Sequence, residues 1–247
     1  MARPSSSDGQ FGNRLLDSLP ESERARIAPS VRRRETDLRD RLYQQGSYIT
    51  TVYFPVNAVV SILTSMNDGP GVEIATIGNE GMVGHALFLG SATMPAREFS
   101  QVQVPGDVLL MDAAAFRSLI DSDGAVREVI QRYVQALFSQ VSQQVACNGL
   151  HSVERRCSRW LLLTHDRVDS DEFPLTQEFL SQMLGVRRAS VTLAAGALQK
   201  AGFIEYRRGR LKIIDRAGLE GASCECYQVI RDEFDRLLGF SGHHSPE

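Results

Sequence analysis

The segment from Leu175 to Lys200 places the strongest constraint on the fold of this chain of 247 residues. Thr176 is suited to cap a helix, whose apolar face would contain Phe179, Leu180, Met183 and Leu184. Gly185 then stands where the tight turn of a helix-turn-helix needs a residue that readily adopts φ > 0. Because residues 187–200 have the pattern of a second helix, the segment predicts a helix-turn-helix.

The second predicted helix carries two kinds of side chain. Its apolar side is made by Val191, Ala194, Ala195 and Leu198, and its other side or its start by Arg187, Arg188, Ser190 and Thr192. A recognition helix has this layout, because its apolar side holds it on the domain while its first polar residues meet base edges and phosphates.

A basic hairpin is predicted directly after this helix. Two runs of alternating apolar residues, within 203–214, flank Arg208-Gly209-Arg210. Seven basic residues lie between Arg187 and Lys212 against one acid, although the formal net charge of the chain is −3. A helix-turn-helix followed by a basic hairpin is a winged helix, and its local positive charge favours a DNA partner over a solvated charged face.

The expected DNA contacts are of two kinds. Arg187 or Arg188 is expected to donate two hydrogen bonds to a guanine. Phosphate contacts that set the register are expected from Ser190, Thr192, Lys200, Arg208 and Arg210, and the predicted interface is completed by Thr176 and Gln177. The chain has no G-x-S-x-G motif, P-loop or nucleophile–base–acid set, which argues against the alternative that it is an enzyme.

The first half of the chain has the pattern of a small antiparallel barrel or roll. Runs of β-branched and aromatic residues predict strands at 52–54, 59–63, 72–77, 99–104 and 108–111. Clusters of turn-forming residues separate these runs, as in all-β architectures. One amphipathic helix is expected before them, from Leu15 to Ala28, and a disordered tail over residues 1–14.

A long amphipathic helix is predicted from Asp123 to Cys147, a stretch without proline. Its apolar residues recur at spacings of four and three, at Val126, Ile130, Val134, Leu137, Val141 and Val145. We predict that this stripe pairs with a second copy of the chain, the alternative being that it packs on its own domain. Asn148-Gly149 is expected to act as a hinge, followed by a helix at 152–164 and a loop at 169–174.

In this order of elements the chain resembles the Crp/Fnr superfamily of bacterial transcription regulators, over about residues 15–216. The resemblance is most specific from Thr176 to Val191, where Arg188 takes the place of the family's base-reading arginine and Ser190 that of its phosphate-contacting threonine. It implies an α+β fold with a β-roll effector domain at 15–122, a dimerisation helix and hinge at 123–149, and a winged helix-turn-helix at 150–216. An amphipathic helix within 217–247 is expected either to pack on the DNA-binding domain or to extend the dimer contact.

The resemblance also implies a function. The chain is expected to be a cytoplasmic homodimer that binds a palindromic site on double-stranded DNA, with RNA polymerase as a further candidate partner. Ala189 stands where the family often has a glutamate that accepts from cytosine, so an altered base preference is expected.

The counterpart of the family's effector pocket is assigned to Glu80, Gly81, Met82, Gly84 and Arg97. Met82 replaces the glutamate of cyclic-nucleotide-binding members, and their Arg-Ser pair is not reproduced. Control by cyclic AMP is therefore not expected. Two alternatives stay open, a regulator gated by another small molecule and a regulator that needs no ligand.

No metal or cofactor is predicted. The four cysteines do not form paired CxxC motifs and, without an export signal or a transmembrane run, are expected to be reduced thiols. Cys224-Glu225-Cys226 lacks the ligands for a metal site, because no histidine or third cysteine is near it in sequence. His85 is expected to pack in the fold and not to bind haem, and His243-His244 to lie in a disordered tail.

Overall fold

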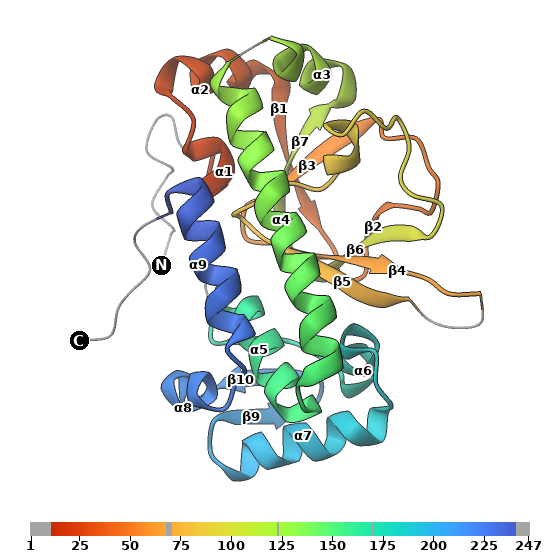
Figure 1. Cartoon of the computed structure of the whole chain (residues 1–247), viewed down its shortest axis with the longest axis vertical. Helices are drawn as coiled ribbons and strands as arrows, with labels where there is room; N and C mark the ends of the chain where they lie inside the picture. Colours follow the sequence, from red (N-terminus) through yellow and green to blue (C-terminus); the bar gives the residue numbers. More distant parts are fainter. Residues whose placement is uncertain (1–10, 68–70, 123, 169, 241–247) are drawn as a thin grey trace.

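The structure is a computed structural model that describes residues 11–67, 71–122, 124–168 and 170–240. A β-roll forms the upper part of the molecule in Figure 1, and a helical domain with a small sheet forms the lower part. Helices α4 (Ala125–Leu150) and α9 (Cys226–Leu238) run side by side along both parts. This arrangement confirms the predicted α+β fold, with an N-terminal β-roll, a long helix and a C-terminal helix-turn-helix. The predicted tail at His243-His244 lies outside the described residues.

The roll consists of two antiparallel sheets, with strand orders β1-β7-β3 and β2-β6-β4-β5. Its strands are β1 (Val31–Thr36), β2 (Arg41–Tyr43), β3 (Thr51–Pro55), β4 (Val59–Thr64), β5 (Val72–Ile77), β6 (Glu98–Val104) and β7 (Gly106–Asp112). All five predicted strands form. Strands β1 and β2 were not predicted, because four of the six residues of β1 are charged and exposed at the edge of its sheet, and β2 has only three residues.

The helix predicted from Leu15 to Ala28 is wrong as a single element. The structure has α1 (Arg14–Asp17), α2 (Glu21–Ile27) and a 3-10 turn, η1 (Ala28–Ser30), because Pro20 interrupts the first helix and stands at the N-cap of the second. Asn13, within the predicted tail, is fully buried, and its Nδ2 donates to the carbonyl oxygen of Gly81 at 3.0 Å. The rest of that predicted tail, residues 1–10, lies outside the described residues.

The long helix α4 follows α3 (Ala113–Asp121) and ends later than the sequence predicts. It continues through Asn148-Gly149 to Leu150, and the amide of His151 still donates to the carbonyl oxygen of Cys147 at 3.1 Å. The predicted hinge at Asn148-Gly149 is therefore wrong, since one further helical turn forms there. The break lies at His151-Ser152, before α5 (Val153–His165).

The C-terminal part contains a three-stranded sheet of order β8-β10-β9 and five helices among the described residues. Its elements after α5 are β8 (Glu172–Pro174), α6 (Gln177–Leu184), α7 (Arg188–Lys200), β9 (Ile204–Arg207), β10 (Arg210–Ile213), α8 (Arg216–Gly221) and α9. The loop predicted at 169–174 thus contains a short strand, which we missed because it has only three residues and ends in proline. The single C-terminal helix that we predicted is divided into α8 and α9.

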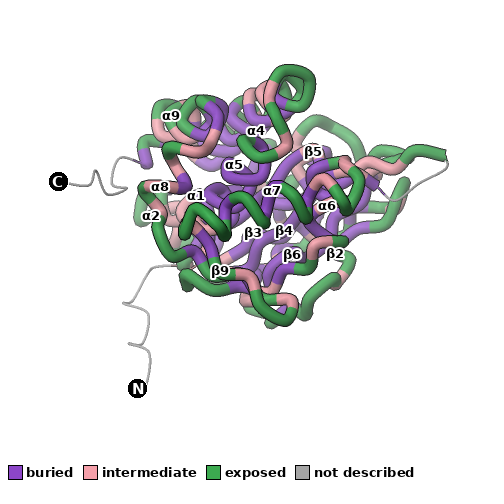
Figure 2. The backbone as a smooth tube through the Cα atoms, turned by 90° about the horizontal axis from the view of Figure 1, so that it is seen from below, coloured by how far each residue is buried: buried purple, intermediate pink, exposed green. Residues whose placement is uncertain are grey.

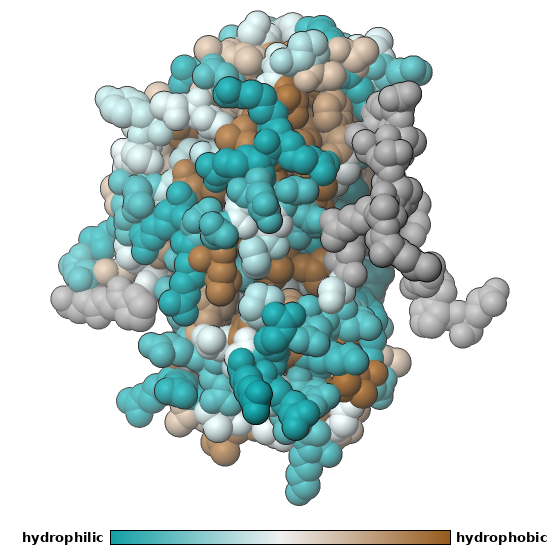
Figure 3. All heavy atoms as spheres, turned by 180° about the vertical axis from the view of Figure 1, so that it is seen from behind, coloured by the Kyte–Doolittle hydropathy of each residue, from teal (hydrophilic) through white to brown (hydrophobic). Residues whose placement is uncertain are grey.

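One continuous hydrophobic core extends from the roll through α4 and α5 to the winged helix. The buried segments lie in the middle of Figure 2, and α4 and α9 lie together along its upper edge. On the side of the molecule opposite these helices, apolar residues form separate patches among hydrophilic ones (Figure 3). Within the ranges that the structure describes, no helix has the length and apolar character needed to cross a membrane.

Candidate nucleic-acid interface

Helix α6 begins and ends as the sequence predicts. The Thr176 side chain accepts from the amide of Phe179 at 3.1 Å, which caps the first turn. Gly185 has a φ of 63°, and the amide of Val186 donates back to the carbonyl oxygen of Ser181, which closes the helix. This turn sets the angle at which α7 crosses α6 and makes the predicted helix-turn-helix.

Helix α7 has one buried and one exposed side. Its buried side is the predicted one, with exposures of 4% or less at Val191, Ala194, Ala195 and Leu198. Of the predicted DNA contacts on this helix, Ser190 is half-buried, while exposed positions are taken by Arg187, Arg188, Thr192 and Lys200. In Figure 2, α7 crosses the middle of the lower face of the molecule with its outward turns exposed.

The two arginines stand at the start of α7, since Arg187 is its N-cap and Arg188 its first residue. The first amides of a helix have no partner within that helix, so this end of α7 suits a phosphate as well as a base edge. The hydroxyl of Thr192 donates to the side-chain oxygen of Gln177 at 2.8 Å. This bond joins the start of α6 to the exposed side of α7, so the predicted contacts at Gln177 and Thr192 lie next to each other.

One residue of this face was missed by the sequence reasoning. Leu193 is 73% exposed and lies on the outward side of α7, beside the exposed positions Ala189 and Gly196. An apolar side chain in this position can contact a thymine methyl group. The available signal was helical spacing, because Leu193 follows Ala189 by four residues and faces away from Val191 and Ala194.

The hairpin of β9 and β10 forms the wing, and β8 pairs with its other edge. Arg208 and Gly209 both have positive φ, at 49° and 78°, as a two-residue hairpin turn requires. Arg208 is exposed at the tip. Arg210 forms an ion pair with Glu172 of β8, which offsets part of its charge. Within the described part of the chain Arg208 makes no ion pair and is the freer wing cation.

The residues predicted for the effector pocket lie in different environments in the described part of the chain. Glu80 is buried and forms an ion pair with Arg167, with 2.7 Å between Oε1 and Nη2. Met82 is fully buried, and a Cβ atom on Gly81 would lie 2.5 Å from the ring of Tyr133. Arg97 is exposed, so its guanidinium stands apart from the buried carboxylate of Glu80.

The apolar stripe of α4 predicted for dimerisation is divided between the core of its own chain and the surface. Three of its residues are buried in the core of the same chain, namely Val126, Ile130 and Leu137. Val134 and Val141 are half-buried, and Val145 is 69% exposed. Phe138, which we did not select, is 72% exposed and lies between them. Val134, Phe138, Val141 and Val145 therefore form an apolar row at the surface of α4, and Leu150, its last residue, is 80% exposed.

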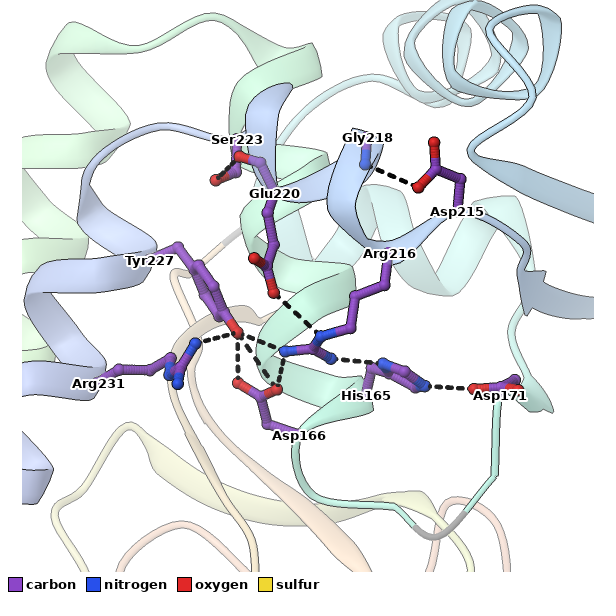
Figure 4. A network of polar contacts seen from close by, with 10 residues as sticks. All are labelled: His165, Asp166, Asp171, Asp215, Arg216, Gly218, Glu220, Ser223, Tyr227 and Arg231. Atoms are coloured by element: carbon purple, nitrogen blue, oxygen red, sulfur yellow. Dashed lines mark hydrogen bonds and ion pairs between the residues drawn. The ribbon is translucent and has the colours of Figure 1, made fainter. Parts of the chain in front are cut away.

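Helix α9 lies on its own chain, packed along α4 and joined to the end of α5 by a polar network (Figure 4). Asp166 accepts from Tyr227 Oη at 3.0 Å and from Arg216 Nη2 at 2.5 Å. Arg231, one turn further along α9, donates to the same Tyr227 oxygen at 3.1 Å. The network ties α5, α8 and α9 together, so the C-terminal helix is an integral part of the winged-helix side of the molecule.

The expectation that Cys224 and Cys226 lack further metal ligands is wrong. Cys147 and His151, at the end of α4, lie beside these two cysteines, and the four ligand atoms are all within 4.8 Å of one another. Cys224 also precedes α9, whose first residue is Cys226, so the two thiols are not constrained to point apart as they would be within one helix. Sequence reasoning missed the cluster because its two halves are far apart along the chain.

Comparisons with known proteins agree with this geometry. Residues 155–222 match the family model described as Crp-like helix-turn-helix domain. A search among curated proteins finds no sequence relative. The resemblance to the Crp/Fnr superfamily that the sequence predicted is confirmed by this match together with the shared fold of solved structures.

Three solved structures illustrate the shared fold. FixK2 from Bradyrhizobium japonicum is 15% identical with a TM-score of 0.65, and the alignment covers 78% of this chain and 98% of that one. TTHB099, a transcriptional regulator of the CRP family from Thermus thermophilus, is 18% identical with a TM-score of 0.64, covering 78% and 99%. The c-di-GMP responsive global regulator CLP of Xanthomonas campestris is 16% identical with a TM-score of 0.60, covering 78% and 99%.

Proposed function

We propose that this chain is a sequence-specific DNA-binding transcription regulator that acts in the cytoplasm. The exposed face of α7 carries the proposal, because Arg187 and Arg188 stand at the start of a helix whose other side is fully buried. The wing adds a second basic element, whose tip is Arg208. In this arrangement the start of α7 reads base edges in the major groove, while Lys200 and the wing contact phosphates.

The regulator is proposed to work as a homodimer. Val134, Phe138, Val141 and Val145 are spaced four, three and four residues apart, which is the spacing of a coiled-coil seam. A second copy with the same seam covers these four side chains and gives the pair a two-fold axis. Two copies of α7 then meet two half-sites, so a palindromic DNA site is expected.

The β-roll is proposed not to bind cyclic AMP. The carboxylate of Glu80 already forms an ion pair with Arg167. The side chain of Arg97 is exposed, so its guanidinium is not placed in a buried pocket where it could bind a cyclic phosphate. A specific observation favours a different small molecule as a second candidate. A cavity of about 170 Å³ lies between β4, β5, η2 (His85–Leu87) and α4, with a mainly apolar lining.

The contents of this cavity suggest the class of ligand. His85 is half-buried there, and its buried Nδ1 atom has no hydrogen-bond partner among the described residues. Val134, Phe138 and Val141 of the proposed seam also line the cavity, so a small apolar ligand with one polar atom for His85 would touch both the roll and the dimer contact. Native mass spectrometry of the purified chain, with and without added cyclic nucleotides, tests two claims: first, that the roll does not bind cyclic AMP, and second, that the purified chain carries a different small molecule. A cyclic nucleotide that survives purification would contradict the first claim.

DNA binding is tested by selecting bound duplexes from a random pool and then measuring affinity for the preferred site. The Arg188→Ala variant is expected to bind that site about 5- to 150-fold more weakly, the equivalent of about 1–3 kcal/mol. Arg32→Ala is the matched control, because Arg32 is an exposed arginine on β1, in the roll. Equal affinities of the Arg188→Ala and Arg32→Ala variants would show that α7 is not the recognition helix.

A further inference from the structure

Three buried cysteines and one histidine meet where α4 ends and α9 begins. Cys147 is in the last turn of α4 and His151 is its C-cap residue, whereas Cys224 and Cys226 lead into α9. The cysteines are at most 2% exposed, and they form a buried cluster that is separate from the main hydrophobic core. These side chains are therefore held together away from solvent without being part of the apolar packing.

The distances within the cluster match those around one tetrahedral ion. Cys147 Sγ and Cys224 Sγ are 3.5 Å apart, and Cys226 Sγ is 3.5 Å from His151 Nδ1. A zinc ion bound at about 2.3 Å from sulfur and 2.0–2.1 Å from nitrogen separates neighbouring ligand atoms by roughly 3.5–3.8 Å. All four ligand atoms lie within 4.8 Å of one another, so small adjustments bring them to this geometry.

The groups around the cluster are those that support a metal site. The other ring nitrogen of His151, Nε2, lies 3.2 Å from the carboxylate of Glu225, and this pairing orients a histidine that binds metal through Nδ1. Gln143 donates to the sulfur of Cys226 at 3.0 Å, as an amide does to a thiolate. Because the Glu225 contact uses Nε2, it leaves Nδ1 of His151 available to a metal ion.

Two buried arginines beside the cluster also favour an anionic site. Arg156 and Arg159 of α5 are 7% and 2% exposed, and the Nε atom of each is buried without a hydrogen-bond partner. Neither makes an ion pair with a carboxylate in the part of the chain that the structure describes. Three thiolates and a neutral imidazole around a divalent ion carry a net charge of −1, which would offset buried positive charge beside them.

We propose that Cys147, His151, Cys224 and Cys226 bind one Zn²⁺ ion, through three thiolates and the Nδ1 atom of the imidazole. The ion ties the start of α9 to the end of α4, beside the break at His151-Ser152 that separates the long helix from the winged helix. Cysteine-rich tetrahedral sites with no open position are structural zinc sites, so the proposed role is to fix this junction. The proposal rests on the cluster alone and stands whether or not α7 binds DNA.

Two other uses of the cysteines are distinguishable from zinc binding. A disulfide between Cys147 and Cys224 requires their sulfurs at about 2.05 Å and leaves Cys226 and His151 without a role. An iron–sulfur cluster attaches its ligands to different iron atoms, and therefore needs the four ligand atoms further apart than a single ion does. The close approach of all four atoms favours the single ion.

The experiment measures the metal content of the full-length chain, purified without chelator, by inductively coupled plasma mass spectrometry. About one zinc per chain is expected, and cobalt in its place is expected to give the visible absorption of a tetrahedral thiolate site. The Cys226→Ser variant is expected to lose zinc affinity by more than 100-fold, measured by competition with a coloured chelator. Cys157→Ser is the matched control, because Cys157 is equally buried but lies in the main core.

A second variant distinguishes a loss of zinc affinity from misfolding of the chain. Glu225 is exposed, and Glu225→Gln removes only the carboxylate behind His151, so zinc affinity is expected to fall about 10- to 100-fold in a folded protein. The assignment would be overturned by a chain that takes up neither zinc nor cobalt, or by an intact mass two hydrogens lower with no metal bound. Equal losses in the Cys226→Ser and Cys157→Ser variants would overturn it as well, and so would a preference for iron over zinc from an equimolar mixture.

Discussion

The ion pair between Glu80 and Arg167 gives the sharpest test of how the roll is joined to the winged-helix side. Glu80 lies in the turn after β5, and Arg167 follows α5. Their side chains are 9% and 6% exposed, and Glu80 Oε1 accepts from Arg167 Nε at 2.8 Å and from the amide of Gly78 at 3.1 Å. Replacing Glu80 by Gln keeps the shape of the side chain but leaves the buried guanidinium without its ion-pair partner.

The expected cost follows from that burial. Breaking a buried ion pair by removing one partner costs about 3–5 kcal/mol, because an uncompensated charge stays in a medium of low dielectric constant. For a chain of this size each kcal/mol lowers the melting temperature by about 2–4 °C, so Glu80→Gln is expected to lower it by roughly 6–20 °C. Differential scanning calorimetry of the purified protein at neutral pH measures the shift.

The control is an ion pair of similar geometry at the surface. Arg33 and Asp107 are 3.2 Å apart with side chains 51% and 29% exposed, so Arg33→Gln is expected to cost about 0–1 kcal/mol. The double variant Glu80→Leu with Arg167→Met is expected to be more stable than Glu80→Gln alone, because it removes both charges. If Glu80→Gln lowered the melting temperature no more than Arg33→Gln does, the reasoning that Glu80 compensates a charge buried away from water would be refuted.

Three further predictions concern other parts of the chain. Phe138→Glu places a charge in the proposed seam of α4 and is expected to convert a dimer into a monomer with little loss of melting temperature; unchanged mass by light scattering would remove the seam from the dimer contact. Burial raises the pKa of Glu73, so the folded state favours the protonated carboxyl, and its contribution to stability is lost as pH rises above the ordinary value of 4.5. Glu73→Gln keeps an acceptor for Trp160 Nε1, now 2.8 Å from the carboxylate, and is expected to flatten the fall of melting temperature as pH rises above 4.5; an unchanged slope would mean another group sets it. Gly185→Ala is expected to cost about 1 kcal/mol or more in urea unfolding, because φ is 63° there and the added Cβ would lie 2.7 Å from Val72; wild-type stability would show that the turn relaxes freely.

The sequence by itself determined the elements whose signals are local. The helix-turn-helix was readable because Thr176, the apolar spacing of α6 and α7, and Gly185 act within a few residues of one another. The wing was readable for the same reason, since a two-residue turn joins two alternating strands. Strands β3 to β7 also follow from local patterning, whereas β1 escaped because its exposed charges hide a strand that only its pairing with β7 reveals.

Only the tertiary structure decided how distant segments meet. Glu80 and Arg167 are 87 residues apart, and Cys147 and Cys224 are 77 apart, so neither pair is visible in any local pattern. Helical spacing found the apolar stripe of α4 but did not divide it between its own core and a partner, because both kinds of contact use the same periodicity. Which side of α4 is covered depends on where β5 and α9 pack against it, and the path of the whole chain sets that.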